Sequence, residues 1–442
     1  MNIPKLLLLF FFLPFFAFSQ TSTQSQQLTL LTHQFIALYN TGDTAQYRAF
    51  ANSIDTTAAS VAHAMGQFSG EQNFVGRVDV KNIQVVSPTE TQTLVQTPRF
   101  ETWWQVIVLT DSAQRYKEHH MRLLRVTNAV LGNRTLLLPE LAGEIEGFIK
   151  RQAAYQPFNG NVLIQKDGKT IYQKSFGTAT TGKQHQMQDR FDLASVGKLF
   201  TAIAILQLVD AHKLQLTDSV AALLPELKNK KLSSITIQQL LTHTSGMGDY
   251  FEDRQYQHIM DSMQAQRGAS GPALYLPFFE RDSLRFAPGK DWAYSNTGFE
   301  LLGYILENVT GTPYKQYIAT HILTPANMHM TIVGGGAGGG QSTVEDMARF
   351  AAALKGFTLI SKPRTQAFFS YTVNGQYGWG SEHQTLAGET IVGHSGGFEK
   401  VCNEVNIYTK SGYTVIILSD TDPPYGHFLG DKIKTLLVQK SS

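Results

Sequence analysis

The sequence is poor in cysteine and in charge. Its 442 residues include a single cysteine, Cys402, so no intrachain disulfide and no thiolate metal cluster can form. Lysine and arginine number 37 against 35 aspartate and glutamate residues, for a net charge of +2. This balance provides neither a basic surface for nucleic acid nor an acidic tail, so we expect no nucleic-acid partner.

Long apolar runs are also missing, because no stretch reaches the 18 residues that a membrane-spanning helix needs. The longest run, Leu6 to Phe18, follows Lys5 and ends at Ala17-Phe18-Ser19. A basic start, a short apolar core and small residues at the exit predict a cleaved signal peptide over residues 1–19, with the cut near Ser19-Gln20. An uncleaved anchor is the alternative. We expect a secreted or periplasmic protein with no stable membrane span after signal removal.

Apolar residues make up 42% of the chain and charged residues 16%, which is ample material for a folded core. Residues 28–53 show helical periodicity on either side of a break at Tyr39-Asn40-Thr41-Gly42-Asp43, and strand patterns follow from Val78 to Val126. Two helices followed by a strand meander predict a small α+β domain over residues 28–130. This element order and the turn at the break resemble the nuclear-transport-factor-like fold.

A second domain is predicted over residues 140–442, where helices alternate with short strands. A helix is expected at residues 140–154 and a hairpin at residues 162–172, turned at Asp167-Gly168. The last strand pair is expected at Val401 to Tyr408 and Tyr413 to Ser419, followed by a terminal helix at about residues 429–439.

The first candidate for chemistry is Ser195-Val196-Gly197-Lys198, which opens an apolar helix. Positions i and i+3 share a helix face, so the hydroxyl and the amine can meet in the first turn. An apolar wall disfavours the charged amine and lowers the lysine pKa, and such a lysine can take the serine proton. Alone, the motif is weak, because a surface serine beside an extended lysine gives the same pattern.

Two further segments strengthen this hypothesis. Tyr294-Ser295-Asn296 stands just before a helix for which we expect a capping box of Thr297 and Glu300 and an end at Gly311. Its phenol can relay a proton and its amide can position a substrate carbonyl or the lysine. Gly393-His394-Ser395-Gly396-Gly397 reads as a glycine-rich strand that a substrate can approach closely.

Ser-x-x-Lys, then Tyr-x-Asn, then His-Ser-Gly, in this order, resembles the serine β-lactamase and penicillin-binding-protein superfamily. Four segments resemble its class C and esterase branch. They are Phe191-Asp192-Leu193-Ala194-Ser195, Leu240-Leu241-Thr242-His243-Thr244-Ser245-Gly246, Phe286-Ala287-Pro288-Gly289 and Tyr294-Ser295-Asn296-Thr297-Gly298. The resemblance implies an α+β fold in which an antiparallel sheet is flanked by helices and joined by an all-helical subdomain.

The resemblance also implies roles for these residues, with no cofactor and no metal. Ser195 would be the nucleophile, and Lys198 and Tyr294 would handle the proton. Asn296, His394, Ser395 and Gly396 would bind substrate, and the backbone amides of Ser195 and Gly397 would form the oxyanion hole. The family commonly carries lysine where this chain has His394. The loss of that permanent cation makes β-lactams the less favoured substrates.

We therefore expect an exported serine hydrolase that acts through an acyl-enzyme on an ester or on a D-amino-acid peptide or amide, including cell-wall-derived peptides. The alternative is a binding or sensor protein that recognises cell-wall peptides, or acylates once, without turnover.

Other interpretations of these motifs are weaker. Gly393 to Gly397 also fits the G-x-S-x-G elbow of α/β-hydrolases, but too few residues remain for the strand–helix units of that fold. Gly334 to Gly339 fits a dinucleotide fingerprint, but no acidic residue occurs in 350–364, so we expect a flexible loop followed by a helix capped by Ser342 and Glu345. Glu118-His119-His120 reads as strand, where neighbouring side chains diverge, so we expect no metal site there.

Overall fold

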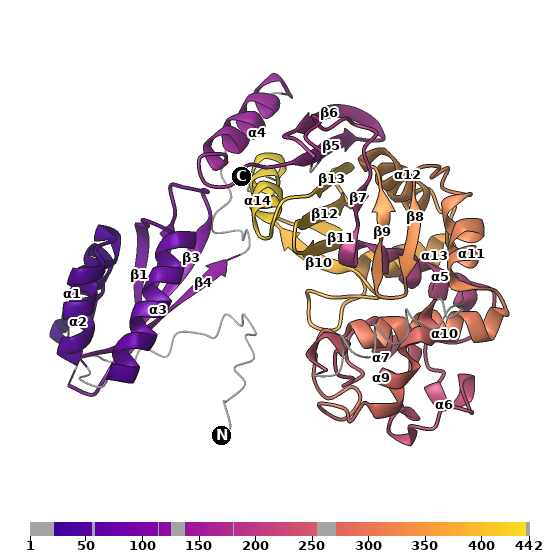
Figure 1. Cartoon of the computed structure of the whole chain (residues 1–442), viewed down its shortest axis with the longest axis horizontal. Coiled ribbons are helices and arrows are strands. Elements are labelled where there is room, and N and C mark those ends of the chain that lie inside the picture. Colours follow the sequence, from indigo (N-terminus) through magenta and orange to yellow (C-terminus); the bar gives the residue numbers. More distant parts are fainter. Residues whose placement is uncertain are drawn as a thin grey trace. The chain divides into compact units, whose positions relative to one another are not determined.

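The computed structural model describes residues 22–54, 58–113, 115–124, 138–179, 181–253 and 271–438. The signal peptide predicted at residues 1–19 lies outside these ranges. The chain divides into two compact units, Met1–Arg125 and Val126–Ser442, which are described separately (Figure 1). Within the described ranges, every helix is too short or too polar to cross a membrane.

The first unit is a helical layer on an antiparallel meander. Its helices are α1 (Ser22–Thr41), α2 (Thr44–Ile54) and α3 (Ala58–Phe74). Its strands are β1 (Asp79–Ser87), β2 (Glu90–Gln96), β3 (Trp103–Thr110) and β4 (Tyr116–Leu124), hydrogen-bonded in the order β1-β2-β3-β4. The helix break at residues 42–43 and three of the strands were predicted correctly, whereas α3 and β2 were not predicted.

The core of this unit lies between the helices and one face of the sheet. Along β3 every second residue is buried, which is the alternation expected of a sheet covered on one side. A polar cluster lies inside this core, where His119 contacts Glu71 at 2.8 Å and the Tyr116 hydroxyl at 2.7 Å. The domain bounds and the nuclear-transport-factor-like resemblance of this unit stay predictions.

The second unit is built on a six-stranded antiparallel sheet with the order β10-β11-β12-β13-β5-β6. The strands are β5 (Gly160–Lys166), β6 (Lys169–Phe176), β10 (Glu382–Leu386), β11 (Glu389–Phe398), β12 (Val401–Tyr408) and β13 (Tyr413–Ser419). The predicted hairpin and the last strand pair are confirmed. Sheets of this kind bury one or both faces against helices, and here both faces are covered.

The helices lie in two layers and one separate group (Figure 1). One face of the sheet packs against α4 (Leu138–Gln152) and α14 (Tyr425–Leu437), and the other packs against α5 (Lys198–Asp210) and α12 (Val344–Lys355). The remaining helices are α6 (Val220–Leu223), α7 (Ile237–Leu241), α9 (Leu276–Arg281), α10 (Asn296–Thr310), α11 (Tyr314–Ile318) and α13 (Lys362–Ser370). Helix α5 is buried on nearly every side, so it forms the centre of the hydrophobic core.

A small three-stranded sheet, β7-β9-β8, replaces the flexible loop expected at Gly334 to Gly339. Its strands are β7 (Phe191–Asp192), β8 (Ile332–Gly335) and β9 (Gly338–Ser342). The glycines allow this hairpin to pass closely over the neighbouring backbone. The expected cap by Ser342 and Glu345 is also wrong, because Thr343 caps α12 and its side chain accepts from the Asp346 N–H at 3.1 Å.

Candidate active site

Ser195 lies in a strained turn at the N-terminus of α5. It belongs to a 3-10 turn, Ala194–Gly197, and α5 itself begins at Lys198, one turn later than predicted. Ala194 has a φ of 45°, in the left-handed region that a non-glycine residue adopts only where its surroundings impose it. The turn therefore holds the Ser195 backbone in one geometry ahead of the helix.

Neighbouring strands impose this geometry through hydrogen bonds. The Leu193 N–H donates to the Gly340 carbonyl of β9 at 2.9 Å. The Asn403 side chain of β12 donates to the Asp192 carbonyl at 2.6 Å. Both bonds fix the backbone immediately before Ser195, so the nucleophile candidate is placed by the sheets and not only by its helix.

Lys198 joins three of the segments that were singled out in the sequence. Its Nζ atom lies 3.1 Å from the Ser195 Oγ, 2.6 Å from the Asn296 Oδ1 and 2.5 Å from the Ala337 carbonyl oxygen. The first contact lies within one helical turn, and the second joins residues 98 positions apart. The third partner, the Ala337 carbonyl, comes from the β8–β9 hairpin and was not anticipated.

The chemistry of these partners determines where the protons of Lys198 point. The Asn296 Nδ2 donates to the Asp249 carboxylate at 2.8 Å, so its Oδ1 is the atom that faces the lysine and can only accept. The Ala337 carbonyl can only accept as well. A neutral amine has two N–H bonds, which these acceptors take, and its lone pair is left for the Ser195 hydroxyl. The arrangement suits a lysine that receives the serine proton.

Burial favours the neutral amine. Lys198 has no exposed surface, and desolvation lowers its pKa from 10.5 to about 7. The carboxylates of Glu300, Asp249 and Glu382 oppose this shift without cancelling it. About half of the lysine is therefore neutral at pH 7.

The loop before α10 differs from the prediction in its capping residue. Ser295 is the cap, because its Oγ accepts from the Gly298 N–H at 3.0 Å, and the expected box of Thr297 and Glu300 is wrong. Gly311 ends the helix in the left-handed conformation, as predicted. Because Ser295 is the cap, Asn296 is the first residue of α10 and stands at the site.

Glu300 does not cap the helix and is instead buried, with only 2% of its surface exposed. Its carboxylate accepts from the N–H groups of Gly336 at 3.0 Å and Ala337 at 2.9 Å. Burial raises the pKa of Glu300 to about 7, and these two hydrogen bonds oppose the rise. Glu300 thus anchors the segment whose Ala337 carbonyl binds Lys198.

Tyr294 lies directly over this pair. Lys198 Nζ is 4.9 Å from the centre of its ring, and the centre of the His243 ring lies 4.2 Å from it. Burial raises the pKa of Tyr294, while the nearby Ser195 hydroxyl opposes the rise, so the phenol is protonated at neutral pH. Among the described residues, none makes a hydrogen bond of ordinary geometry with the Tyr294 hydroxyl.

Strand β11 brings its glycines against the nucleophile turn. A Cβ atom built on Gly396 would lie 2.5 Å from the Leu193 carbonyl oxygen, so only glycine fits this crossing. The close approach places the next residue, Gly397, beside the turn that carries Ser195. The two backbone amides named for the oxyanion hole therefore come from segments in direct contact.

His394 is brought to the site but points into the protein, with 2% of its surface exposed. Its Nε2 lies 2.9 Å from the Tyr377 hydroxyl, and its Nδ1 lies 2.5 Å from the Ser395 carbonyl oxygen. The Tyr377 hydroxyl also lies 3.0 Å from the Nε2 of His243, whose Nδ1 accepts from the Ser295 N–H at 3.2 Å. A buried chain of hydrogen bonds thus links the loop before α10 to β11.

The two ends of this chain fix its direction. The Ser295 N–H can only donate, so His243 carries its proton on Nε2 and donates to Tyr377. Tyr377 then donates to His394 Nε2, and His394 donates from Nδ1 to the Ser395 carbonyl, which can only accept. If His394 carried a second proton, that proton would lie on Nε2 and point at Tyr377. The Tyr377 hydroxyl would then face a donor on each side, from His243 and from His394. This direction, together with burial, which lowers the pKa of both histidines, keeps His394 neutral.

Ser395 faces away from this chain. Its Oγ donates to the Glu382 carboxylate at the start of β10, at 2.5 Å. The sequence singled out Ser395 but not Glu382, since an acidic residue in an otherwise unremarkable segment carries no signal. Asp249, Ala337 and Tyr377 were also missed, because their partners lie far away in the chain, and Glu300 was singled out only as a helix cap.

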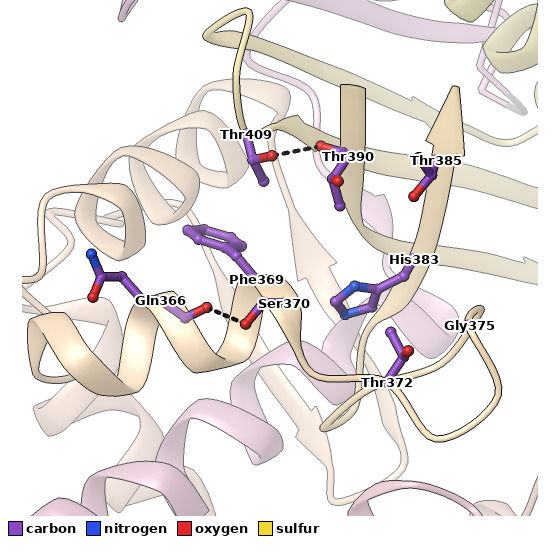
Figure 2. A pocket seen from close by; sticks show the side chains of 9 residues that line it. All are labelled: Gln366, Phe369, Ser370, Thr372, Gly375, His383, Thr385, Thr390 and Thr409. Atoms are coloured by element: carbon purple, nitrogen blue, oxygen red, sulfur yellow. Dashed lines mark hydrogen bonds between the residues drawn. The ribbon is translucent and has the colours of Figure 1, made fainter. Parts of the chain in front are cut away.

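A separate hollow of about 500 Å³ lies between α13 and the strands β10 and β11 (Figure 2). Its lining includes Phe369, Ser370, His383 and Thr385. Because side chains alternate along β10, His383 and Thr385 face the side opposite to Glu382, so this hollow does not contain the residues named above. Nowhere in the described ranges do three or more His, Cys, Asp or Glu side chains gather as a metal site would require.

Comparison with known proteins agrees with this geometry. The sequence model of the family described as Beta-lactamase matches residues 146–440. Penicillin-binding protein 4* of Bacillus subtilis is 29% identical over 327 residues, which cover 60% of this chain and 68% of that protein.

Solved structures show the same fold. The octameric penicillin-binding protein homologue from Pyrococcus abyssi has a TM-score of 0.59 at 24% identity, over 68% of this chain and 78% of that one. The D-amino acid amidase from Ochrobactrum anthropi has a TM-score of 0.57 at 20% identity, over 66% and 97%.

Proposed function

Because the chain belongs to the beta-lactamase family of serine hydrolases, we propose that it is an exported hydrolase in which Ser195 forms an acyl-enzyme with an ester or a D-amino-acid peptide or amide. The observation that carries this proposal is the position of the Lys198 amine. It is fully buried, lies 3.1 Å from the Ser195 hydroxyl, and has both of its N–H bonds directed at acceptors that leave its lone pair for that hydroxyl.

In the first step, neutral Lys198 takes the proton of Ser195 as the oxygen attacks the substrate carbonyl. The carbonyl oxygen becomes an oxyanion, which the backbone N–H groups of Ser195 and Gly397 stabilise. The bond to the leaving group then breaks, and the Tyr294 phenol protonates the departing oxygen or nitrogen. The Lys198 ammonium returns its proton to Tyr294, which restores both groups.

In the second step, water replaces the leaving group. Its proton passes to the same pair as the water oxygen attacks the acyl carbonyl. The pair returns that proton to the Ser195 oxygen as the acyl bond breaks, which releases the acid and free Ser195. Asn296 serves both steps by holding Lys198, and Asp249 fixes the orientation of Asn296.

The environment of His394 supports a preference for substrates without a carboxylate beside the scissile bond. His394 is neutral and bonded to Tyr377, so it supplies no permanent cation at this edge of the site. β-Lactams, which carry such a carboxylate, are therefore the less favoured substrates.

Two wider proposals accompany this one. Residues 1–19 direct export, with cleavage near Ser19-Gln20, and the substrate is a small molecule or peptide, including fragments of the cell wall. Residues 140–442 form the catalytic domain, while residues 28–130 form a small separate domain.

The experiment compares hydrolysis of p-nitrophenyl acetate, a D-amino-acid amide and nitrocefin by the wild-type enzyme, Ser195→Ala and Ser395→Ala. We expect turnover of the ester or the amide. Ser195→Ala should lower it at least a thousandfold, whereas Ser395→Ala, which removes a substrate contact but not the nucleophile, should lower it far less. A penicillin probe that attaches once without later release would instead favour the sensor alternative. Full activity in Ser195→Ala would refute the proposal.

A further inference from the structure

Strand β11 has an open edge beside the nucleophile. Strand β10 pairs with β11 from Leu386 opposite Glu389 to Glu382 opposite Gly393, where the pairing stops. Strand β12 continues on the other side as far as Val401 opposite Phe398. From His394 onward, β11 is therefore paired on one side only among the described strands, and this edge passes the turn that carries Ser195.

Glu382 stands at the corner where the open edge begins. Opposed residues of an antiparallel pair face the same side, and residues two apart on one strand do as well. Glu382, Gly393 and Ser395 therefore share one face, and the 2.5 Å hydrogen bond from the Ser395 Oγ to the Glu382 carboxylate runs diagonally across it. The Glu382 side chain is 39% exposed, and its Oε1 lies 3.8 Å from the Nδ1 of the buried His394.

The Glu382 carboxylate acts electrostatically on the two groups proposed to carry the proton, Lys198 and Tyr294. It raises the pKa of Lys198 and of Tyr294, as the Asp249 carboxylate also does. Two carboxylates, Glu382 and Asp249, therefore act on the reacting groups at this edge.

The hydrogen bond between Ser395 and Glu382 also decides which substrate group fits beside them. The Ser395 proton is donated to Glu382, so the Ser395 oxygen offers only lone pairs to a substrate. A substrate carboxylate would meet a like charge and an acceptor, whereas an ammonium group can donate one N–H to Glu382 and another to Ser395.

We infer that Glu382 is a specificity-determining residue that selects substrates with a positively charged amine beside the scissile carbonyl, namely esters, amides or peptides with a free α-ammonium group. This inference rests on the proposed function of Ser195 and names the substrate class of that site. The ammonium lies against Glu382 and Ser395 while the adjacent carbonyl enters the oxyanion hole.

The test uses benzyl thioesters that differ in a single group. The D- and L-alanyl thioesters carry an ammonium at pH 6.5, since an α-amine has a pKa near ~8, and the isobutyryl thioester has a methyl group in its place. For each enzyme the kcat/KM for the alanyl substrate is divided by that for the isobutyryl substrate. Both substrates depend on the same Lys198, so a change in its pKa cancels in this ratio.

Wild type, Glu382→Gln, Glu382→Lys and the control Glu226→Gln are compared. Glu226 lies on the exposed surface, so its variant removes the same charge away from the open edge. We expect Glu382→Gln to lower the ratio roughly five- to hundredfold, mainly through KM, because a charge-assisted contact is lost. Glu382→Lys should lower it further, and Glu226→Gln should leave it unchanged.

The inference is overturned if the wild-type enzyme cleaves the isobutyryl thioester as well as both alanyl thioesters, or if Glu382→Gln keeps the wild-type ratio. In either case the proposed function stands, provided that Ser195→Ala abolishes cleavage. Failure of the proposed function gives a different result: no thioester is cleaved by any enzyme, or cleavage persists in Ser195→Ala, and the inference then falls with it.

Discussion

Replacement of Glu300 by glutamine should shift the pH profile of the enzyme toward acid. Glu300 is the first of the three carboxylates that raise the pKa of Lys198, and it acts from a fully buried position. Glutamine removes this charge and keeps nearly the same shape. Its amide can accept only one of the two N–H bonds from Gly336 and Ala337, so we also expect a loss of stability of about 1–3 kcal/mol.

The magnitude follows from the Lys198 pKa of about 7. The general base must be neutral, so activity is present above this pKa and is lost as the pH falls through it. About half of the lysine is neutral at pH 7, but only about one tenth at pH 6 and one hundredth at pH 5. With an unperturbed pKa of 10.5, about three molecules in ten thousand would be neutral at pH 7.

Loss of a nearby opposite charge lowers a lysine pKa by about 1–3 units. Because the Glu300 pKa is also about 7, Glu300 is about half ionised at the Lys198 inflection, so we expect a shift at the lower end of this range. In Glu300→Gln the inflection should therefore move from near pH 7 to near pH 6. Relative to its own plateau, the variant should then be about fivefold more active at pH 6 than the wild type.

The assay measures kcat/KM for a neutral ester from pH 5 to 9, because this quantity reports the pKa values of the free enzyme. Glu307→Gln is the matched control, since Glu307 lies on the same helix and accepts from the Tyr314 N–H at 2.7 Å. It should keep the wild-type inflection. A flat wild-type profile, or the same inflection in wild type and Glu300→Gln, would refute the reasoning about Lys198.

Three further predictions follow from the geometry. Tyr377→Phe leaves the buried nitrogens of His243 and His394 without their shared hydroxyl, so we expect a loss of about 1–3 kcal/mol in chemical denaturation and a lower kcat, and unchanged stability would contradict the directed chain. Gly396→Ala places a methyl group 2.5 Å from the Leu193 carbonyl, so kcat/KM should fall at least tenfold, whereas Gly143→Ala on α4 meets no atom within 4 Å and should keep activity. The segment from about residue 135 to 442 should be soluble and cleave the same ester, and an inert or aggregated product would show that the first unit completes the site or the core.

Elements with a strong local signal were predictable from the sequence. Val401–Tyr408 and Tyr413–Ser419 are apolar, β-rich runs bounded by a Lys-Ser-Gly turn, and both strands were placed to the residue. Helix α3 was missed, because only Val61, Met65 and Phe68 mark its buried face, among alanines, glycines and polar residues.

The site was predictable only as far as its motifs extend. Ser195, Lys198 and Asn296 were singled out by spacing and resemblance, and the structure brings them into contact. Glu300 was assigned to a cap because it stands three residues after a threonine, but Ser295 took the cap and left the carboxylate for the β8–β9 hairpin. Such a pairing depends on how distant segments pack, and no local pattern encodes it.

The most direct test of the central claim is mass mapping of the enzyme after reaction with a fluorophosphonate. We predict one adduct per chain, on the peptide that contains Ser195, its loss in Ser195→Ala, and slower labelling in Lys198→Ala. A label on Ser395, or undiminished labelling of Ser195→Ala, would contradict the assignment of Ser195 as the nucleophile.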